Sequence, residues 1–144
     1  MAALALDISE RFACTAGGLR RARALTRSAV GPVWAALADD AELCVGEAFG
    51  NALRHTRSGR DGGDVGLHLY ALPCGPLYID LSDDGPLRPG DRPAIRPGAG
   101  GLEAESGRGL LLIESLTAHW FYVPTGPAGG LLCLTLLTTR PSLR

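Results

Sequence analysis

The chain has no lysine: all 14 of its basic residues are arginine, and the formal net charge of its 144 residues is −1. Without a lysine amine, it has no P-loop lysine, no Schiff-base lysine and no strand lysine of the eukaryotic protein-kinase type. It also lacks the overall positive charge on which non-specific binding to nucleic acid depends. Several classes of nucleotide-dependent enzyme are therefore excluded, and nucleic acid is not expected as a direct partner.

The sequence also lacks the marks of a disulfide framework, a zinc site, a secretory signal and a membrane span. Its 4 cysteines form no CxxC pair and no Cys/His cluster with zinc spacing, so free thiols in a reducing compartment are expected. The first six residues are apolar, but they have no basic leader and are soon interrupted by Asp7 and Glu10. No uncharged apolar run reaches ~18 residues. We therefore predict a cytoplasmic protein that makes no membrane contact.

The pattern of apolar residues predicts five strands, at 11–15, 65–70, 77–82, 119–123 and 131–138. Helical spacing predicts helices at 18–30, 39–55 and 109–118, with Asp39 or Asp40 as the N-cap of the second. Four prolines and four glycines between residues 86 and 106 predict a long lid loop. This order favours a single α+β domain over 1–144, a two-layer sandwich with helices on one face of a mostly antiparallel sheet.

The second predicted helix carries an acid, an amide and a basic group on one face. At about 100° per residue, with Glu47 at zero, Asn51 lies at about +40° and Arg54 at about −20°. Apolar side chains fill the adjoining arc, so most of this helix should be buried, and a polar stripe there indicates a ligand beneath it. The alternative is a core helix whose stripe faces solvent. Gly46 and Gly50 flank the stripe, where bare backbone could admit either the ligand or a neighbouring segment.

Two further segments can contribute to a pocket. Asp83-Asp84-Gly85 follows a predicted strand, and Gly85 would let the backbone approach a ligand closely. Gly107-Arg108-Gly109 opens a predicted helix, where free N–H groups and the helix dipole favour a phosphate and Arg108 adds positive charge. Taken alone, the first segment is more typical of an ordinary turn, and the second is weak evidence.

In type and order, the segments 47–56, 83–85 and 105–110 resemble the nucleotide-binding boxes of the gyrase, heat-shock-chaperone and histidine-kinase ATPase superfamily. More narrowly, residues 11–138 look similar to the bacterial anti-sigma-factor serine kinases. The resemblance implies a Bergerat-type ATP-binding fold, in which helices pack on one face of a mostly antiparallel mixed sheet. It also implies ATP and Mg²⁺ as ligands.

The resemblance gives each matching residue an expected role. Asn51 would supply its side-chain oxygen to Mg²⁺, and Glu47 would act as the catalytic acid or base that orients or deprotonates the attacking hydroxyl. Arg54 would reach a phosphate, with His55 at the rim. Asp83 would accept a hydrogen bond from the exocyclic amine of adenine. The set implied to bind ATP is Asn51, Arg54, His55, Asp83, Gly85, Gly107, Arg108, Gly109 and Leu110.

The function implied is regulatory. On the resemblance, the protein would bind a sigma factor, phosphorylate a serine or threonine on an anti-anti-sigma antagonist, and form a homodimer. Leu87 stands where the family pattern has a second lid glycine, which bears on lid movement and turnover. One alternative is a non-catalytic switch, in which nucleotide binding exposes or hides a partner surface. Another is the ATP-binding half of a histidine kinase, which is disfavoured because those kinases usually have asparagine where Glu47 stands.

Overall fold

The computed structural model describes residues 3–60, 62–88, 105–126 and 128–138, with the backbone alone for 105–108. In this part of the chain, five strands form one sheet: β1 (Leu6–Ala13), β2 (Asp64–Ala71), β3 (Leu77–Asp83), β4 (His119–Pro124) and β5 (Gly130–Leu136). The helices are α1 (Ala16–Val30), α2 (Ala38–His55) and α3 (Glu105–Leu116), together with the short 3-10 turns η1 (Ala35–Leu37) and η2 (Arg57–Gly59).

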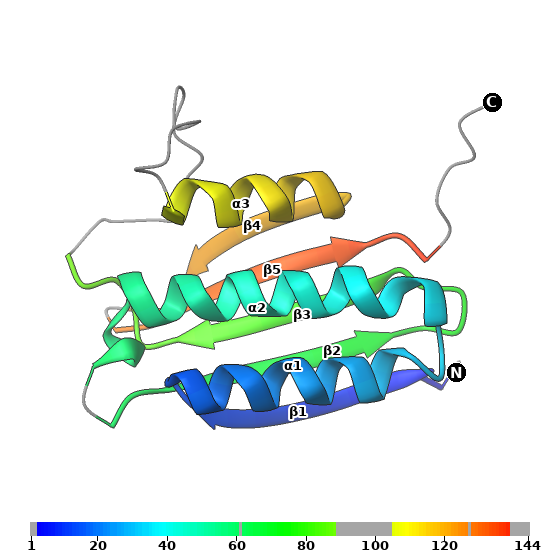
Figure 1. The fold of residues 1–144 in the computed structure, drawn as a ribbon, viewed down its shortest axis with the longest axis horizontal. Coiled ribbons are helices and arrows are strands. Elements are labelled where there is room, and N and C mark those ends of the chain that lie inside the picture. The colour runs from blue at the N-terminus through cyan, green and yellow to red at the C-terminus, as the bar shows by residue number, and fades with distance from the viewer. Residues whose placement is uncertain (1–2, 61, 89–104, 127, 139–144) are drawn as a thin grey trace.

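The sheet runs in the order β1-β2-β3-β5-β4, and every neighbouring pair is antiparallel. The helices lie on one face of it, with α1 along β1, α2 along β3 and α3 along β4 (Figure 1). α2 packs between α1 and α3. The predicted α+β sandwich is therefore confirmed, and the described strands are antiparallel throughout rather than mixed.

Strand alternation explains the two layers. In β2, Val65, Leu67 and Leu69 point toward the helices and are at most 2% exposed, while the residues between them face the open side. On α2, Val45 and Phe49 belong to the same core and are both fully buried. Burying a side chain of this kind contributes roughly 1.5–3 kcal/mol. The apolar face of α2 is thereby fixed against the sheet, which also fixes the direction of its polar stripe.

The N-cap of α2 and the start of β1 differ from the sequence prediction. Asp39 and Asp40 do not cap α2, because the helix follows directly on η1 and both aspartates lie in its first turn. There the helix dipole favours them, and Asp39 pairs with Arg27 of α1. β1 starts at Leu6 rather than at residue 11, because its middle residues are mostly exposed and hide the alternation that marks a strand.

Neither disulfides nor a membrane span shapes the described part of the fold. All four cysteines are free, as predicted: Cys14, Cys44, Cys74 and Cys133. Burial raises the pKa of Cys14 to about 11 and that of Cys44 to about 12, so both thiols stay protonated near neutral pH. None of the helices in the described ranges combines the length and the apolar character that crossing a membrane requires.

Candidate functional site

The amide nitrogen of Asn51 on α2 is buried without a hydrogen-bond partner among the described residues. Asn51 is 6% exposed, and no group in the described part of the chain pairs with its Nδ2. A buried polar group left unpaired costs about 1–3 kcal/mol, and such groups are rare in folded proteins. The fold alone would favour an apolar residue at this position. An exception of this kind is expected where a side chain is kept for a ligand.

The carboxylate of Glu47, one turn before Asn51, reaches α3. A Cβ built on Gly109 would lie 2.6 Å from Glu47 Oε2, closer than real Cβ contacts come. Gly109 is itself buried, so its missing side chain leaves the space that the carboxylate occupies between α2 and α3. The sequence predicted Gly109 as part of a phosphate cradle. The structure adds a second reason for glycine there, which is contact with Glu47.

The two glycines beside the stripe have different neighbours. At Gly50, a Cβ would lie 3.3 Å from Nη1 of Arg54, so the guanidinium of this exposed arginine folds back over α2. At Gly46, a Cβ would lie 3.4 Å from Cδ of Arg23 on α1. Gly46 therefore allows a neighbouring helix to approach, whereas Gly50 leaves room for a positive charge beside the stripe.

Asp83 ends β3 and closes a tight turn with Gly85. Its Oδ1 accepts a hydrogen bond from the Gly85 N–H at 2.7 Å. Gly85 has a φ of +90°, a conformation that residues with side chains rarely adopt. A Cβ there would also lie 3.1 Å from the backbone nitrogen of Gly129 in the turn between β4 and β5. Conformation and space both require glycine at this position.

The surroundings of the Asp83 carboxyl group disfavour its ionised form. Burial raises its pKa above the ordinary value, and the neighbouring Asp84 adds to the rise. Two hydrogen bonds oppose it, one from the Gly85 N–H and one from the Tyr122 hydroxyl, whose oxygen lies 3.5 Å from Oδ1. A carboxyl group whose pKa is perturbed in this way, beside a second polar site, is a candidate for ligand recognition.

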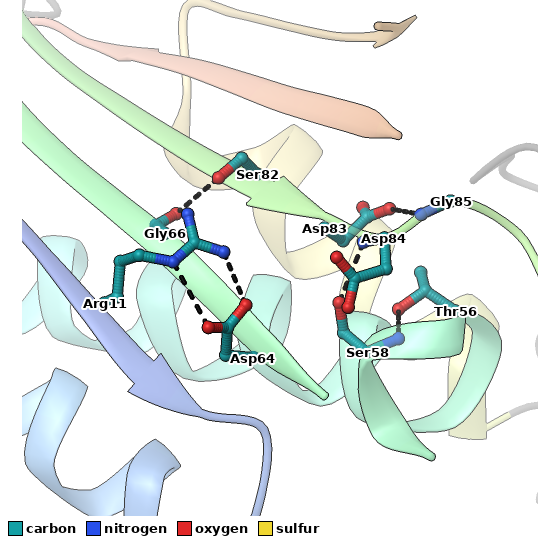
Figure 2. A network of polar contacts seen from close by, with 9 residues as sticks. All are labelled: Arg11, Thr56, Ser58, Asp64, Gly66, Ser82, Asp83, Asp84 and Gly85. Carbon is teal, nitrogen blue, oxygen red and sulfur yellow. Dashed lines mark hydrogen bonds and ion pairs between the residues drawn. The ribbon is translucent and has the colours of Figure 1, made fainter. Parts of the chain in front are cut away.

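A hydrogen-bonded junction ties the end of α2 to the Asp83 turn. The Asp84 N–H donates to Ser58 Oγ at 2.8 Å, and the Ser58 N–H donates to Thr56 Oγ1 at 3.2 Å (Figure 2). The Arg57 N–H donates to the Gly85 carbonyl at 2.8 Å. Ser58 is fully buried and Thr56 is 8% exposed. The stripe on α2 and the turn after β3 are therefore held together by buried polar contacts.

The predicted lid, 86–106, falls mostly on 89–104, outside the described residues. Its first residues are tied to the end of α2: Pro86 forms a bridge with Thr56, and the Leu87 N–H donates to the His55 carbonyl at 3.2 Å. Any residue except proline can make the contact of Leu87, because it uses only the main chain. Leu87, which stands where the family pattern has a glycine, is thus hydrogen-bonded through its main chain to the end of α2.

α3 begins at Glu105, four positions before the predicted start at Gly109. Gly107 and Arg108 therefore lie within its first turn, and the predicted phosphate contact of the Arg108 side chain falls outside what the structure describes. Leu110 is 4% exposed and belongs to the hydrophobic core. The structure thus places the backbone of this segment beside Glu47, and it places Leu110 in the packing beneath.

Sequence reasoning missed two residues at this end of the molecule. Ser58 lies in a glycine-rich connection that gave no motif, and only the fold shows that it is buried against Asp84. Tyr122 lies on the helix-facing side of β4, opposite Leu132. Strand parity could have placed Tyr122 on that face, but nothing in the sequence indicated its contact with Asp83.

The arrangement can be compared with known protein families. The model of the histidine kinase-like ATPase domain matches residues 12–136, from the end of β1 to the end of β5. No curated protein matches the chain. Within the described ranges, no three His, Cys, Asp or Glu side chains gather as a metal site would require. A metal ion beside Asn51 would therefore take most of its ligands from phosphate and water.

Proposed function

Because the chain belongs to the histidine kinase-like ATPase family, we propose that it is a regulatory protein that binds ATP with Mg²⁺ and phosphorylates a serine or threonine of a partner. Its partners are a sigma factor, which it sequesters, and an anti-anti-sigma antagonist, which it phosphorylates. It works in the cytoplasm and as a homodimer. Family membership supports ATP binding. The likeness of three segments to the anti-sigma-factor serine kinases supports the narrower function.

One observation carries the nucleotide site: Asn51 is buried, and its amide Nδ2 has no hydrogen-bond partner among the described residues. An amide oxygen is a hard ligand that suits Mg²⁺, and Mg²⁺ commonly keeps only one or two protein ligands beside phosphates and water. Asn51 therefore fits the metal that accompanies ATP. Glu47 lies one helical turn before Asn51, so its carboxylate would be close to a metal ion bound there.

The protein's own chemistry centres on Glu47. Bound ATP supplies the phosphoryl group to be transferred. The Glu47 carboxylate, seated against Gly109, can orient an incoming hydroxyl group and accept its proton. Arg54, exposed beside Gly50, supplies positive charge for a phosphate.

A second candidate, the non-catalytic switch, is favoured by one specific observation. The first residues of the lid are joined to the end of α2 through the Leu87 N–H and the His55 carbonyl. A ligand that moves the end of α2 would therefore move the start of the lid with it. Such coupling would report nucleotide binding to a partner without any phosphoryl transfer.

Thermal unfolding with ATP and Mg²⁺ tests nucleotide binding. At ligand concentrations near 100 times Kd, binding adds about 2.7 kcal/mol to the free energy of unfolding, which raises Tm by several degrees. Asn51→Ala should lose most of this shift. Glu42→Gln, which changes an acid on the same helix that pairs with Arg23 and Arg27, should keep it. No shift in the wild-type protein would rule out ATP binding.

Transfer of labelled phosphate from ATP to a purified antagonist separates the kinase from the switch. Glu47→Gln should bind ATP normally and lose transfer by a factor of about 10²–10⁴. An unchanged rate in Glu47→Gln would remove its role as the base. If the wild-type protein binds ATP and transfers nothing, the switch replaces the kinase.

Affinity purification from the native cell, with and without ATP, tests the partners. A sigma factor and a small antagonist protein should be recovered, and ATP should change the ratio between them. Recovery of other partners, with neither of these present, would contradict the anti-sigma function while leaving ATP binding intact.

A further inference from the structure

Tyr122 on β4 and Asp83 on β3 meet across the intervening strand β5. Asp83 lies opposite Gly130 of β5, and Tyr122 lies opposite Leu132, so the two side chains approach each other diagonally over Gly130 on the helix-covered face. A Cβ built on Gly130 would overlap the Tyr122 hydroxyl. Glycine at 130 therefore keeps open the path along which the tyrosine reaches the aspartate.

The two oxygens of the Asp83 carboxyl group are used differently. Oδ1 accepts both hydrogen bonds, from the Gly85 N–H at 2.7 Å and from the Tyr122 hydroxyl at 3.5 Å. From the described residues, Oδ2 accepts none. The tyrosine contact is long for an O–H···O bond, and contacts of this kind tighten when a ligand orders the site. One oxygen is thus anchored by the protein, while the other is left for a donor from outside.

We propose that Tyr122 is a positioning residue for nucleobase recognition, holding Asp83 through Oδ1 so that Oδ2 accepts a hydrogen bond from the exocyclic amine of a bound base. This role rests on the proposed binding of ATP. It makes the preference for an amine-bearing purine depend partly on a residue that does not touch the base, because the direction of the acceptor is set from β4.

The surrounding charges support this assignment. Burial, followed by the nearby Asp83, raises the pKa of Tyr122 to about 12, so its hydroxyl remains a donor throughout the physiological range. Asp83 also faces the carboxyl group of Asp84 and the thiol of Cys14, whose own pKa of about 11 keeps it neutral. Among these side chains, Tyr122 is the one whose hydrogen bond favours the ionised, accepting form of Asp83.

Binding of two nucleotides to the full-length chain tests the role: ATP, and purine riboside triphosphate, whose base lacks the exocyclic amine. Tyr122→Phe should weaken ATP binding by about three- to tenfold and leave binding of purine riboside triphosphate within about twofold. In Tyr122→Phe, the pH below which ATP affinity falls should be higher than in the wild type, because the lost hydrogen bond favoured the ionised form of Asp83. Tyr70→Phe is the matched control, since Tyr70 donates to Asp80 on the open face at 3.3 Å. Both of its affinities should match the wild-type values.

Two results would overturn the role of Tyr122. Equal loss of affinity for both nucleotides in Tyr122→Phe would mean a general structural defect, and no loss for either would mean that Asp83 is oriented without the tyrosine. Both results leave ATP binding by the wild-type chain intact. If the wild-type chain binds neither nucleotide, the proposed function itself fails, and the role of Tyr122 fails with it.

Discussion

Two aspartates at the same end of the sheet meet opposite electrostatic settings (Figure 2). Asp64, at the start of β2, faces the open side and accepts hydrogen bonds from the Arg11 guanidinium, which lower its pKa. Asp83, at the end of β3, faces the helices, and burial raises its pKa. The same residue type is therefore favoured as an anion on one face and disfavoured as an anion on the other.

This difference separates a carboxylate that its own neighbours stabilise from one that we propose binds a ligand, without reference to any motif. Asp64 is satisfied where it lies, and its exposed pair with Arg11 needs no other purpose. Asp83, in contrast, lies where burial favours the neutral form of its carboxyl group. Perturbed groups of that kind cluster at binding sites because recognition demands a charge or an acceptor that folding does not.

The rest of each face follows the same division. On the open face, His68 pairs with Asp7 and stacks on Tyr70, and Tyr70 stacks in turn on Tyr78. On the covered face, the amide Nδ2 of Asn51 has no partner in the described structure. These open-face side chains pair with one another, whereas the buried Nδ2 of Asn51 has no such partner among the described residues.

The largest expected contrast between the faces is in stability. Ile79→Ala removes a fully buried side chain of β3 and should lower the free energy of unfolding by about 2–5 kcal/mol. Ser82→Ala changes an open-face residue of the same strand and should stay within about 0.5 kcal/mol of the wild-type value. Urea unfolding of the two variants measures both effects. Equal losses would mean that the open face is as tightly packed as the covered one.

A smaller effect of opposite sign is expected at Asn51. Asn51→Leu replaces a buried amide whose Nδ2 is unpaired by an apolar side chain of similar size, and should raise the free energy of unfolding by about 1 kcal/mol. The same variant should lose ATP binding. Denaturant unfolding and nucleotide titration on one preparation measure the two properties. Destabilisation in the absence of nucleotide would show that Asn51 serves the fold rather than a ligand.

The order of elements and the helix-covered face were predictable from sequence, because alternation in 65–70 and 77–82 and helical spacing in α2 are local patterns. The contacts between segments were not. The placement of Glu47 against Gly109, and of Tyr122 over Gly130, depends on how two elements far apart in the chain are packed. Phe121 is 52% exposed, because the alternation of side chains along β4 places it on the open face.

The pH dependence of stability sharpens the contrast at Asp83. Since its pKa is higher in the folded than in the unfolded chain, its contribution to stability is present below the unfolded value, near 3.8, and is lost as pH rises through the folded pKa. Asp83→Asn should therefore be more stable than the wild type at pH 7, and the gain should shrink in acid. Urea unfolding at pH 7 and pH 4 measures this. A gain that is the same at both pH values would mean that charge is not its cause.

Asp64 should give the opposite sign and the smallest effect. Its folded pKa is lowered by Arg11, so its contribution is present above the unfolded value and is lost as pH falls through the folded pKa. Asp64→Asn should destabilise the protein at pH 7 by about 0.2–1 kcal/mol, since the pair is exposed, and 1 M salt should remove much of that loss by screening. Urea unfolding at low and high salt measures it. A larger, salt-independent loss would place Asp64 among the buried determinants of the fold and erase its contrast with Asp83.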